Sequence, residues 1–364
     1  MFLKNLVIAL AILVVACAEK QEDAIKIGAM LPLTGDNSSY GVYCKNGMNL
    51  ALEEFEKEYK LSAKIIFEDS AANPKTAVNA VNKLIKRDQV NIILGGMFST
   101  TTMAIAPIAQ ENEIVLISPT AADENIPKIG KFIFSIYPSA AFEGKVMAEY
   151  LINSKSKQIG VFAQQTPVAE AIADSFIEQM NKLGKSIVFS ATFPEKTKNF
   201  RNIIYTELME KDIDALFISS YASEAGAFIR QVREYGFKGQ IYSQSSLYDK
   251  KIIEDYGNFV DGVEITAPFF NSENKLNYLD EFRMKYLQKF GEEPNVWAAY
   301  GFDVASLALK SLKEAIQNKS KIEDVVLNST LQGVTGETSF NPDRTVNKSL
   351  QIFKIENSEF IKVK

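Results

Sequence analysis

The chain contains no histidine, and this absence excludes more kinds of active site than any other feature of its composition. Without histidine there is no His-based catalytic triad and no His metal ligand, and the commonest general base of enzymes is missing. The sequence also lacks a G-x-S-x-G turn, a P-loop, a G-x-G-x-x-G motif and a C-x-x-C pair. We therefore expect a protein that is not an enzyme and that carries no metal ion and no cofactor.

Cysteine is almost as scarce, with only Cys17 and Cys44 in 364 residues. If Cys17 is modified, no disulfide can form within the chain, so the fold must rest on its core. Cys44 lies in an apolar stretch and is expected to be a buried small hydrophobic residue. An apolar content of 46% is enough for two or three compact units. The net charge of -5 gives no general attraction to phosphate backbones, so nucleic acid is not an expected partner.

Long apolar runs are absent except at the N-terminus, where an uninterrupted run covers residues 6–16. This run is shorter than the roughly 20 residues of a membrane-spanning helix, and it is typical of a secretory signal peptide over residues 1–16. A retained single-span anchor is the alternative. The sequence Val14-Val15-Ala16-Cys17 resembles the lipobox of bacterial lipoproteins. That resemblance implies that Cys17 is acylated and anchors the chain to a membrane, with residues 17–23 as a short tether.

Beyond the tether, short apolar runs alternate with stretches of helical period as far as about residue 265. The expected strands are 25–31, 63–67, 90–94, 114–117, 132–136, 158–162, 186–193, 215–219 and 240–242. The expected helices are 41–59, 74–87, 101–111, 140–153, 168–183, 199–210 and 223–235. This order predicts an α/β protein with mostly parallel sheets covered by helices on both faces.

The alternation restarts near residue 140, which predicts two lobes. After about residue 267 the pattern becomes helical over 275–290, 295–317 and 322–328, and it closes with strand-like segments at 350–355 and 360–363. No linker rich in proline, glycine or serine separates these parts. We therefore expect the two lobes to be interleaved along the chain.

Two loops are the best candidates for a binding site, because ligands of open parallel sheets bind beyond the carboxyl ends of the strands. The first loop has two glycines, Gly95 and Gly96, followed by four hydroxyl side chains over residues 99–102. Helix capping needs one of these hydroxyls and leaves three available. The second loop, residues 118–123, reads Ser-Pro-Thr-Ala-Ala-Asp. Together the loops predict a cradle for an anion.

The two loops, in this order and spacing, resemble the leucine/isoleucine/valine-binding family of type I periplasmic binding proteins, which serve ATP-driven importers. The resemblance runs from residue 25 to residue 342, and it rests on the collinear order of short motifs that are individually weak. The further motifs are Pro32-Leu33-Thr34-Gly35, Tyr40-Gly41, Asp69-Ser70, Asn73-Pro74, Ser220-Tyr221, Ile229-Arg230-Gln231, Trp297-Ala298-Ala299-Tyr300 with Asp303, and Gly336-Glu337-Thr338-Ser339-Phe340-Asn341.

The resemblance implies a set of ligand-binding residues. In the family, a serine after the third strand and the next loop hold a ligand carboxylate, aromatic residues line the cleft, and an acid holds an ammonium group. The matching positions here are Tyr40, Ser99, Thr100, Thr120, Ala121, Ala122, Tyr221 and Ser245. Ala122 replaces a frequent threonine, and Ser245 replaces the acid. Either another acid, such as Asp123 or Glu224, serves the ammonium group, or the ligand has none.

The resemblance also implies two Rossmann-like lobes joined by a hinge of three segments. Lobe 1 is expected at 24–138 plus 268–338 and lobe 2 at 139–267 plus 339–364, with crossings near Tyr137, Ala267 and Ser339. A monomer of this kind binds a small solute outside the cytoplasmic membrane, closes on it and docks on the permease of an ABC importer.

Two other readings stay open. The same fold serves ligand-sensing receptors. A carboxylate-based extracellular hydrolase would need two acids facing each other in the cleft, and Asp69, Asp123 and Asp303 are the residues to test.

Replacing Cys17 with serine should abolish membrane attachment, because serine offers no thiol for acylation. We expect the variant to be released or to stay unprocessed, as judged by membrane fractionation and by the mass of the mature N-terminus. Cys44→Ser is the matched control and should stay anchored. A processed Cys17→Ser protein that remains in the membrane fraction would rule out the lipid anchor.

Overall fold

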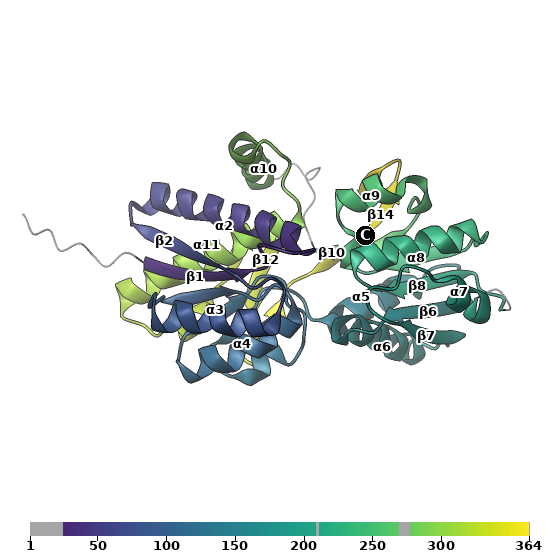
Figure 1. Cartoon of the computed structure of the whole chain (residues 1–364), viewed down its shortest axis with the longest axis horizontal. Coiled ribbons are helices and arrows are strands. Elements are labelled where there is room, and N and C mark those ends of the chain that lie inside the picture. Colours follow the sequence, from purple (N-terminus) through teal and green to yellow (C-terminus); the bar gives the residue numbers. More distant parts are fainter. Residues whose placement is uncertain (1–24, 209–210, 269–276, 364) are drawn as a thin grey trace, which may run out of the picture.

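The computed structural model describes residues 25–208, 211–268 and 277–363, so the predictions on residues 1–23 lie outside the described residues. The chain forms two lobes that lie side by side along the long axis of the molecule (Figure 1). Within the described ranges, no helix combines the length and the apolar character needed to cross a membrane.

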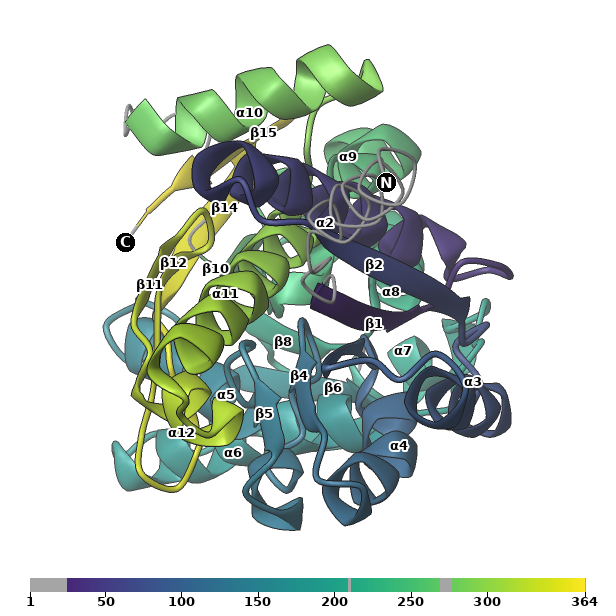
Figure 2. The same cartoon turned by 90° about the vertical axis from the view of Figure 1, so that its left-hand side faces the viewer.

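The first lobe is built on a five-stranded parallel sheet with the strand order β2-β1-β3-β4-β5. Helices α2 and α11 cover one face of this sheet, and α3 and α4 cover the other (Figure 2). The strands are β1 (Ile25–Leu31), β2 (Ala63–Asp69), β3 (Ile92–Gly95), β4 (Val115–Ser118) and β5 (Ile133–Ser135). The helices up to β5 are α2 (Ser38–Tyr59), α3 (Pro74–Lys86), α4 (Ser99–Glu111) and the 3-10 turn η1 (Ile126–Ile129).

The second lobe repeats this strand order as β7-β6-β8-β9-β10 and extends it at one edge with the antiparallel strands β14 and β15. Its strands are β6 (Ile159–Gln164), β7 (Phe189–Phe193), β8 (Ala215–Ser219), β9 (Gln240–Ser243), β10 (Glu264–Pro268), β14 (Leu350–Glu356) and β15 (Glu359–Lys362). Its helices are α5 (Ala140–Leu151), α6 (Pro167–Lys182), α7 (Arg201–Glu207), α8 (Ala222–Glu234) and α9 (Lys250–Tyr256), with the 3-10 turns η2 (Ser245–Leu247) and η3 (Gly257–Phe259).

Between β10 and β14 the chain returns to the first lobe. It forms α10 (Asn277–Phe290), α11 (Val296–Asn318), α12 (Ile322–Asn328) and a small sheet of β11 (Leu331–Gly333), β12 (Gly336–Phe340) and β13 (Val346–Asn347). The ring of Phe340 in β12 packs on Phe134 of β5 with a centroid distance of 5.2 Å. The third passage between the lobes therefore lies between β13 and β14 and not near Ser339. The first two passages follow β5 and β10.

The elements expected from sequence periodicity are present, with small shifts at their ends. The helix expected from residue 41 begins at Ser38, and the helix expected from residue 101 begins at Ser99. Strands β10 to β13 and helix α9 were not expected. Strand β10 is completed by β14, which lies far along the chain, and β11 and β13 are too short to show a period.

Helices α2 and α11 pack so closely that one contact leaves no room for a side chain. A Cβ atom added to Gly47 would lie 1.9 Å from the carbonyl oxygen of Ala298. Such a distance cannot be relieved by a rotamer change, because the neighbour is backbone. Glycine at this position fixes the distance between α2 and α11, and with it the position of the two aromatic residues near their N-termini, Tyr40 and Trp297.

Gly47→Ala should lower the free energy of unfolding by about 1–3 kcal/mol, because the added methyl group forces the two helices apart. Helix propensity alone predicts the opposite sign, a gain of about 1 kcal/mol. Urea denaturation measures the difference. Lys57→Ala, on the exposed side of the same helix, should change the unfolding free energy by less than about 0.5 kcal/mol. An unchanged or increased stability of Gly47→Ala would contradict the tight contact.

Candidate ligand-binding cleft

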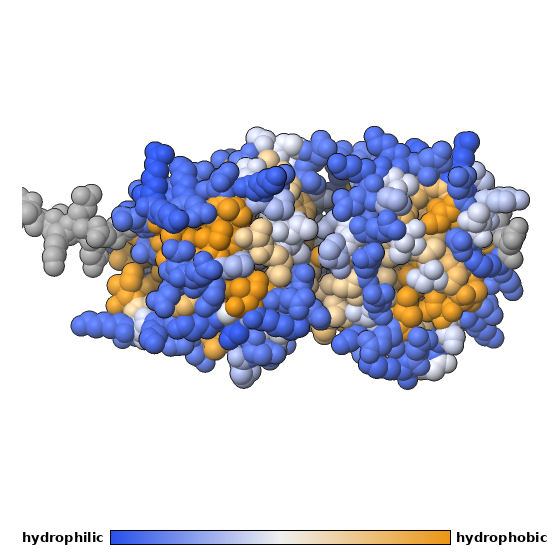
Figure 3. All heavy atoms as spheres, turned by 60° about the horizontal axis from the view of Figure 1, so that its bottom comes forward, coloured by the Kyte–Doolittle hydropathy of each residue, from blue (hydrophilic) through white to orange (hydrophobic). Residues whose placement is uncertain are grey.

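A cavity of about 1070 Å³ lies between the lobes, and residues of both line it. From the side shown in Figure 3, a furrow separates the two halves of the surface. The lining loops follow β3 and β4 in the first lobe and β6, β8 and β9 in the second. In both sheets the strand order reverses beside these loops, between β1 and β3 and between β6 and β8. Open parallel sheets bind ligands at such switch points.

The first-lobe side of the cleft depends on the turn between β3 and α4. Gly95 has a φ of +143°, and a Cβ atom there would lie 2.2 Å from the carbonyl oxygen of Met30. Only glycine fits this conformation, as the sequence suggested. The turn places Ser99 in the first turn of α4, where its side chain is 5% exposed.

The hydroxyl of Ser99 joins the two predicted loops. Its Oγ accepts the backbone N–H groups of Ala122 and Asp123, each at 3.2 Å. Because these bonds use its lone pairs, the Ser99 hydroxyl hydrogen stays available, and it has no acceptor among the described residues. Thr120 also lines the cleft, and its hydroxyl donates to the carbonyl of Met97 at 2.7 Å. This surface can thus offer a hydroxyl donor at the positive end of a helix.

The structure corrects two expectations about these loops. The hydroxyls of Thr101 and Thr102 are buried and donate to the backbone carbonyls of Phe98 and Gly96, so they are not available to a ligand. Of the four expected hydroxyls, only those of Ser99 and Thr100 line the cleft. Ala121 is not among the residues that line the cleft, and its N–H donates to Ser118 Oγ at 2.9 Å.

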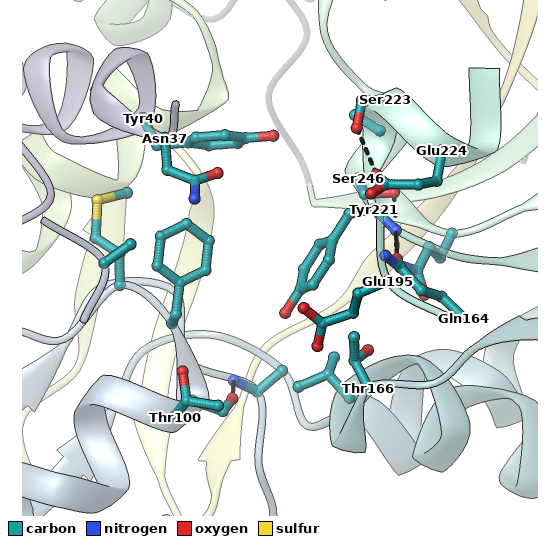
Figure 4. Close-up of a pocket in the computed structure, with 18 of the residues that line it drawn as sticks. Asn37, Tyr40, Thr100, Gln164, Thr166, Glu195, Tyr221, Ser223, Glu224 and Ser246 are labelled. Carbon is teal, nitrogen blue, oxygen red and sulfur yellow. Dashed lines mark hydrogen bonds between the residues drawn. The ribbon is translucent and has the colours of Figure 1, made fainter. Parts of the chain in front are cut away.

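The second-lobe side is held by two buried amide side chains at the ends of strands. Gln164 Oε1 accepts the N–H of Tyr221 at 2.9 Å and the hydroxyl of Ser220 at 3.0 Å. Gln244 donates to the carbonyl of Ser220 at 2.8 Å and accepts the hydroxyl of Ser219 at 2.9 Å. These bonds fix the loop that presents Tyr221. Its ring enters the cavity opposite Tyr40 (Figure 4).

Four aromatic rings form the apolar part of the cleft. Tyr40 packs edge-on against Trp297 and Phe98, with centroid distances of 4.9 and 5.9 Å. Phe98 contacts Tyr221 across the cleft at 6.4 Å. Burial raises the pKa of Tyr221 to about 12 and also raises the pKa of Tyr40, so both phenols are neutral at physiological pH. An apolar ligand group would be enclosed by these rings.

Ser245, the serine at the position expected for an acid, lies beside an acid from another element. Its hydroxyl is 2.6 Å from the hydroxyl of Tyr137, and its N–H donates to Glu143 Oε1 at 2.6 Å. Glu143 belongs to the first turn of α5, is 2% exposed and lines the cavity. Burial raises the pKa of its carboxyl group, an effect that hydrogen bonds from Thr266 and Ser245 partly offset.

The acids considered for hydrolysis are arranged as loop anchors. Asp69 accepts the N–H groups of Leu33 and Ala71, and Asp303 accepts those of Val334 and Thr335. Asp69 and Asp303 do not line the cleft.

Asp123 does line the cleft, but its Oδ1 accepts two hydrogen bonds from Asn125. Glu224 also lines it and accepts the N–H of Lys196 and the hydroxyl of Ser223. Within the part of the chain that is described, no three metal-ligating side chains gather into a metal site.

The structure thus gathers most of the predicted site residues in one cavity. Those that line it are Tyr40, Ser99, Thr100, Thr120, Ala122, Tyr221 and Ser245. Sequence reasoning missed Phe98, Gln164, Gln244 and Glu143. The two glutamines directly end or follow strands β6 and β9, so the rule that placed Ser99 could have found them. Glu143 offers no such signal, because an acid in the first turn of a helix is ordinary.

Comparison with known proteins agrees with this geometry. Residues 24–359 match the family described as periplasmic binding protein. An amino acid binding protein of Pseudomonas aeruginosa is 23% identical over 325 residues, which cover 87% of this chain and 86% of the relative.

One similar solved structure is that of LivJ, the branched-chain amino acid transporter substrate binding protein of Streptococcus pneumoniae, in complex with isoleucine. Its TM-score is 0.86 at 24% identity, and the match covers 94% of this chain and 100% of that chain. A solute binding protein of R. palustris in complex with benzoate has a TM-score of 0.82 at 16% identity, with coverage of 93% and 95%. These two likenesses concern the fold.

The two lobes, the repeated strand order and the cleft between them define a type I periplasmic binding protein. The chain belongs to the periplasmic binding protein family. Proteins of this family act outside the cytoplasm, bind small molecules and work with the permeases of ABC transporters.

Ser99→Ala should lower the unfolding free energy by about 1–3 kcal/mol, because the N–H groups of Ala122 and Asp123 lose their acceptor and that of Ala122 is buried. Urea denaturation without ligand measures the loss. Thr100→Ala removes the neighbouring, exposed hydroxyl and should stay within about 0.5 kcal/mol of the wild type. A Ser99→Ala protein as stable as the Thr100→Ala control and the wild type would mean that the loop contact contributes nothing.

Proposed function

We propose that this protein captures a small carboxylate-bearing solute, in first place an amino acid with an apolar side chain, and delivers it to the permease of an ABC importer. The observation that carries the proposal is the cleft itself. Its polar donors and its aromatic rings come from both lobes, with Ser99 on one side and Tyr221 on the other. A ligand held by both sides favours the closed arrangement of the lobes.

The carboxylate end of the ligand binds at the start of α4. The Ser99 hydroxyl hydrogen has no acceptor in the described chain, and Ser99 and Thr100 place the N-terminus of a 13-residue helix at the cleft. Free N–H groups and the helix dipole favour an anion there. Ser99 also holds the Ala122 loop in position, so one side chain both shapes the subsite and donates to it.

The apolar part of the ligand lies among Tyr40, Phe98, Trp297 and Tyr221. A cavity of about 1070 Å³ is slightly above the range for small-molecule sites, which is about 300–1,000 Å³. It is larger than one amino acid needs. Rotation of the lobes toward each other reduces this volume and brings Tyr221 onto the ligand.

A carboxylic acid without an ammonium group is the second candidate. Ser245 brings no charge to the place where the family resemblance implies an acid, and a structural relative is in complex with benzoate. The rings of the cleft suit an aromatic acid as well as an aliphatic side chain.

We further infer that the protein works as a monomer and is held at the membrane surface by the acylated Cys17. Residues 17–23 are then the tether that leads into β1 at Ile25. The sequence of the N-terminus supports this arrangement.

Leucine is the probe that tests the proposed function. Calorimetry should detect one site per chain, and Ser99→Ala should weaken binding by roughly 10- to 100-fold, because a charge-assisted hydrogen bond contributes about 1.5–3 kcal/mol. Saturating leucine should also lower the radius of gyration in solution scattering. Tyr221→Ala should weaken binding, whereas Tyr205→Ala, with a side chain 62% exposed and outside the cleft, should not. Binding without any change of the scattering profile would contradict closure, and binding insensitive to Ser99 would contradict the subsite.

A further inference from the structure

Glu143 is a carboxylate that two distant parts of the second lobe hold at the wall of the cleft. Its Oε1 accepts the N–H of Ser245, in the turn after β9, and the hydroxyl of Thr266 in β10. The residue is 2% exposed, and it lines the cavity. A side chain fixed by two donors from separate elements cannot turn away from the cleft without leaving those donors unpaired.

Among the described residues, no lysine or arginine forms an ion pair with this carboxylate, and the buried ammonium group of Lys348 donates to the hydroxyl of Thr338. The titratable groups that face it are the phenols of Tyr137, before α5, and Tyr300, in α11. Burial raises the pKa of both phenols well above the ordinary value, so both are neutral and neither supplies positive charge. An ionised carboxylate that is buried without a countercharge is costly. A cation that enters the cleft beside Glu143 removes that cost.

Glu143 lines the same cavity as the subsite proposed for the ligand carboxylate, and Ala122 connects the two elements that carry them. The N–H of Ala122 donates to Ser99 Oγ at 3.2 Å, and the carbonyl of the same residue accepts the N–H of Ala140 at 2.8 Å. Glu143 follows Ala140 by three positions in α5 and therefore lies on the same face of the helix. Ala122 thus bonds on one side to the hydroxyl of Ser99 and on the other side to the first turn of the helix that carries Glu143. An α-amino acid carries its carboxylate and its ammonium group on one carbon, and it needs this pair of opposite partners at short range.

We propose that Glu143 binds the ammonium group of the ligand, which makes the cleft specific for an α-amino acid and not for the corresponding acid without nitrogen. This inference rests on the proposed function. Glu143 supplies from α5 the charge that Ser245 lacks, and the N–H of Ser245 helps to hold it.

The other acids of the cavity do not fit this role. Asp123 and Glu224 are partly exposed, and their oxygens already accept hydrogen bonds from Asn125 and from Lys196 and Ser223. Glu195 is exposed. Water screens charges at such positions, so they contribute little to the binding of an ammonium group. They provide matched controls for the removal of one negative charge from the same cavity.

The test compares two matched pairs of ligands, leucine with 2-oxo-4-methylpentanoate and phenylalanine with phenylpyruvate. Calorimetry on the wild type should show tighter binding of the amino acid in at least one pair. Glu143→Gln keeps an oxygen acceptor for the Ser245 N–H but removes the charge. It should weaken binding of that amino acid by at least about 30-fold and leave the matching keto acid unchanged or bound more tightly. Glu224→Gln and Asp123→Asn should change both affinities by less than about threefold.

Proton linkage gives a second measurement, and its two signs are read from the wild type alone. An ammonium group stabilises the ionised Glu143 and lowers its pKa, so the amino acid should bind with release of protons near the pH at which Glu143 is half protonated. A keto acid brings a second negative charge, raises that pKa and should bind with proton uptake. Calorimetry in buffers of different ionisation enthalpy measures both signs, and Glu143→Gln should abolish both.

The outcomes separate the inference from the function on which it rests. If only the keto acids bind, or if Glu143→Gln weakens both members of a pair equally, Glu143 is a structural residue, and the capture of carboxylates stands. Amino-acid binding without proton release in the wild type would also overturn the inference. If neither member of either pair binds the wild type, both the proposed cargo and the role of Glu143 are wrong.

Discussion

The carboxyl ends of parallel strands all lie at the same edge of a sheet, and this constraint determines where the cleft lies. Both sheets repeat one strand order, β2-β1-β3-β4-β5 and β7-β6-β8-β9-β10, so both have a reversal point at that edge. The loops at the two reversal points line one cavity. The chain passes between the lobes three times, and the two large sheets stay separate. Capture by closure needs this combination of rigid lobes and a common cleft.

The cleft presents groups that are already fixed before a ligand arrives. Ser99 holds the Ala122 loop, and Gln164 holds the loop of Tyr221, in each case through bonds to backbone N–H groups. These contacts leave one hydroxyl hydrogen without an acceptor among the described residues and one aromatic ring at the wall of the cavity. Preorganisation of this kind reduces the entropy that binding must offset. The proposed capture then needs little rearrangement within a lobe and confines the movement to the segments between the lobes.

Several buried ionisable groups lie behind Tyr137, the residue that lines the cleft next to the first passage between the lobes. The ring of Tyr137 lies 5.1 Å from that of Tyr300, which in turn lies below the ammonium group of Lys348, on the third passage between the lobes. Burial lowers the pKa of Lys348 to about 8, while the carboxylate of Asp303 acts in the opposite direction. The protonation state of Lys348 therefore depends on the groups that surround it. A ligand cation beside Glu143 would lie next to Tyr137 and Tyr300, which face that carboxylate.

The sequence alone is enough to predict the α/β class, the two lobes and the main loops of the cleft, because these depend on local periodicity and on residues that directly follow strands, such as Ser99. It does not show which hydroxyls line the cavity, since those of Thr101 and Thr102 donate to nearby backbone carbonyls. Nor could it place the third passage or find Glu143. The partners of Glu143 lie 102 and 123 positions away, and only the packing of α5 against β9 and β10 brings that carboxylate to Ser245 and Thr266. Long-range contacts of this kind leave no local pattern, so only the folded chain shows that a buried carboxylate lines the cleft.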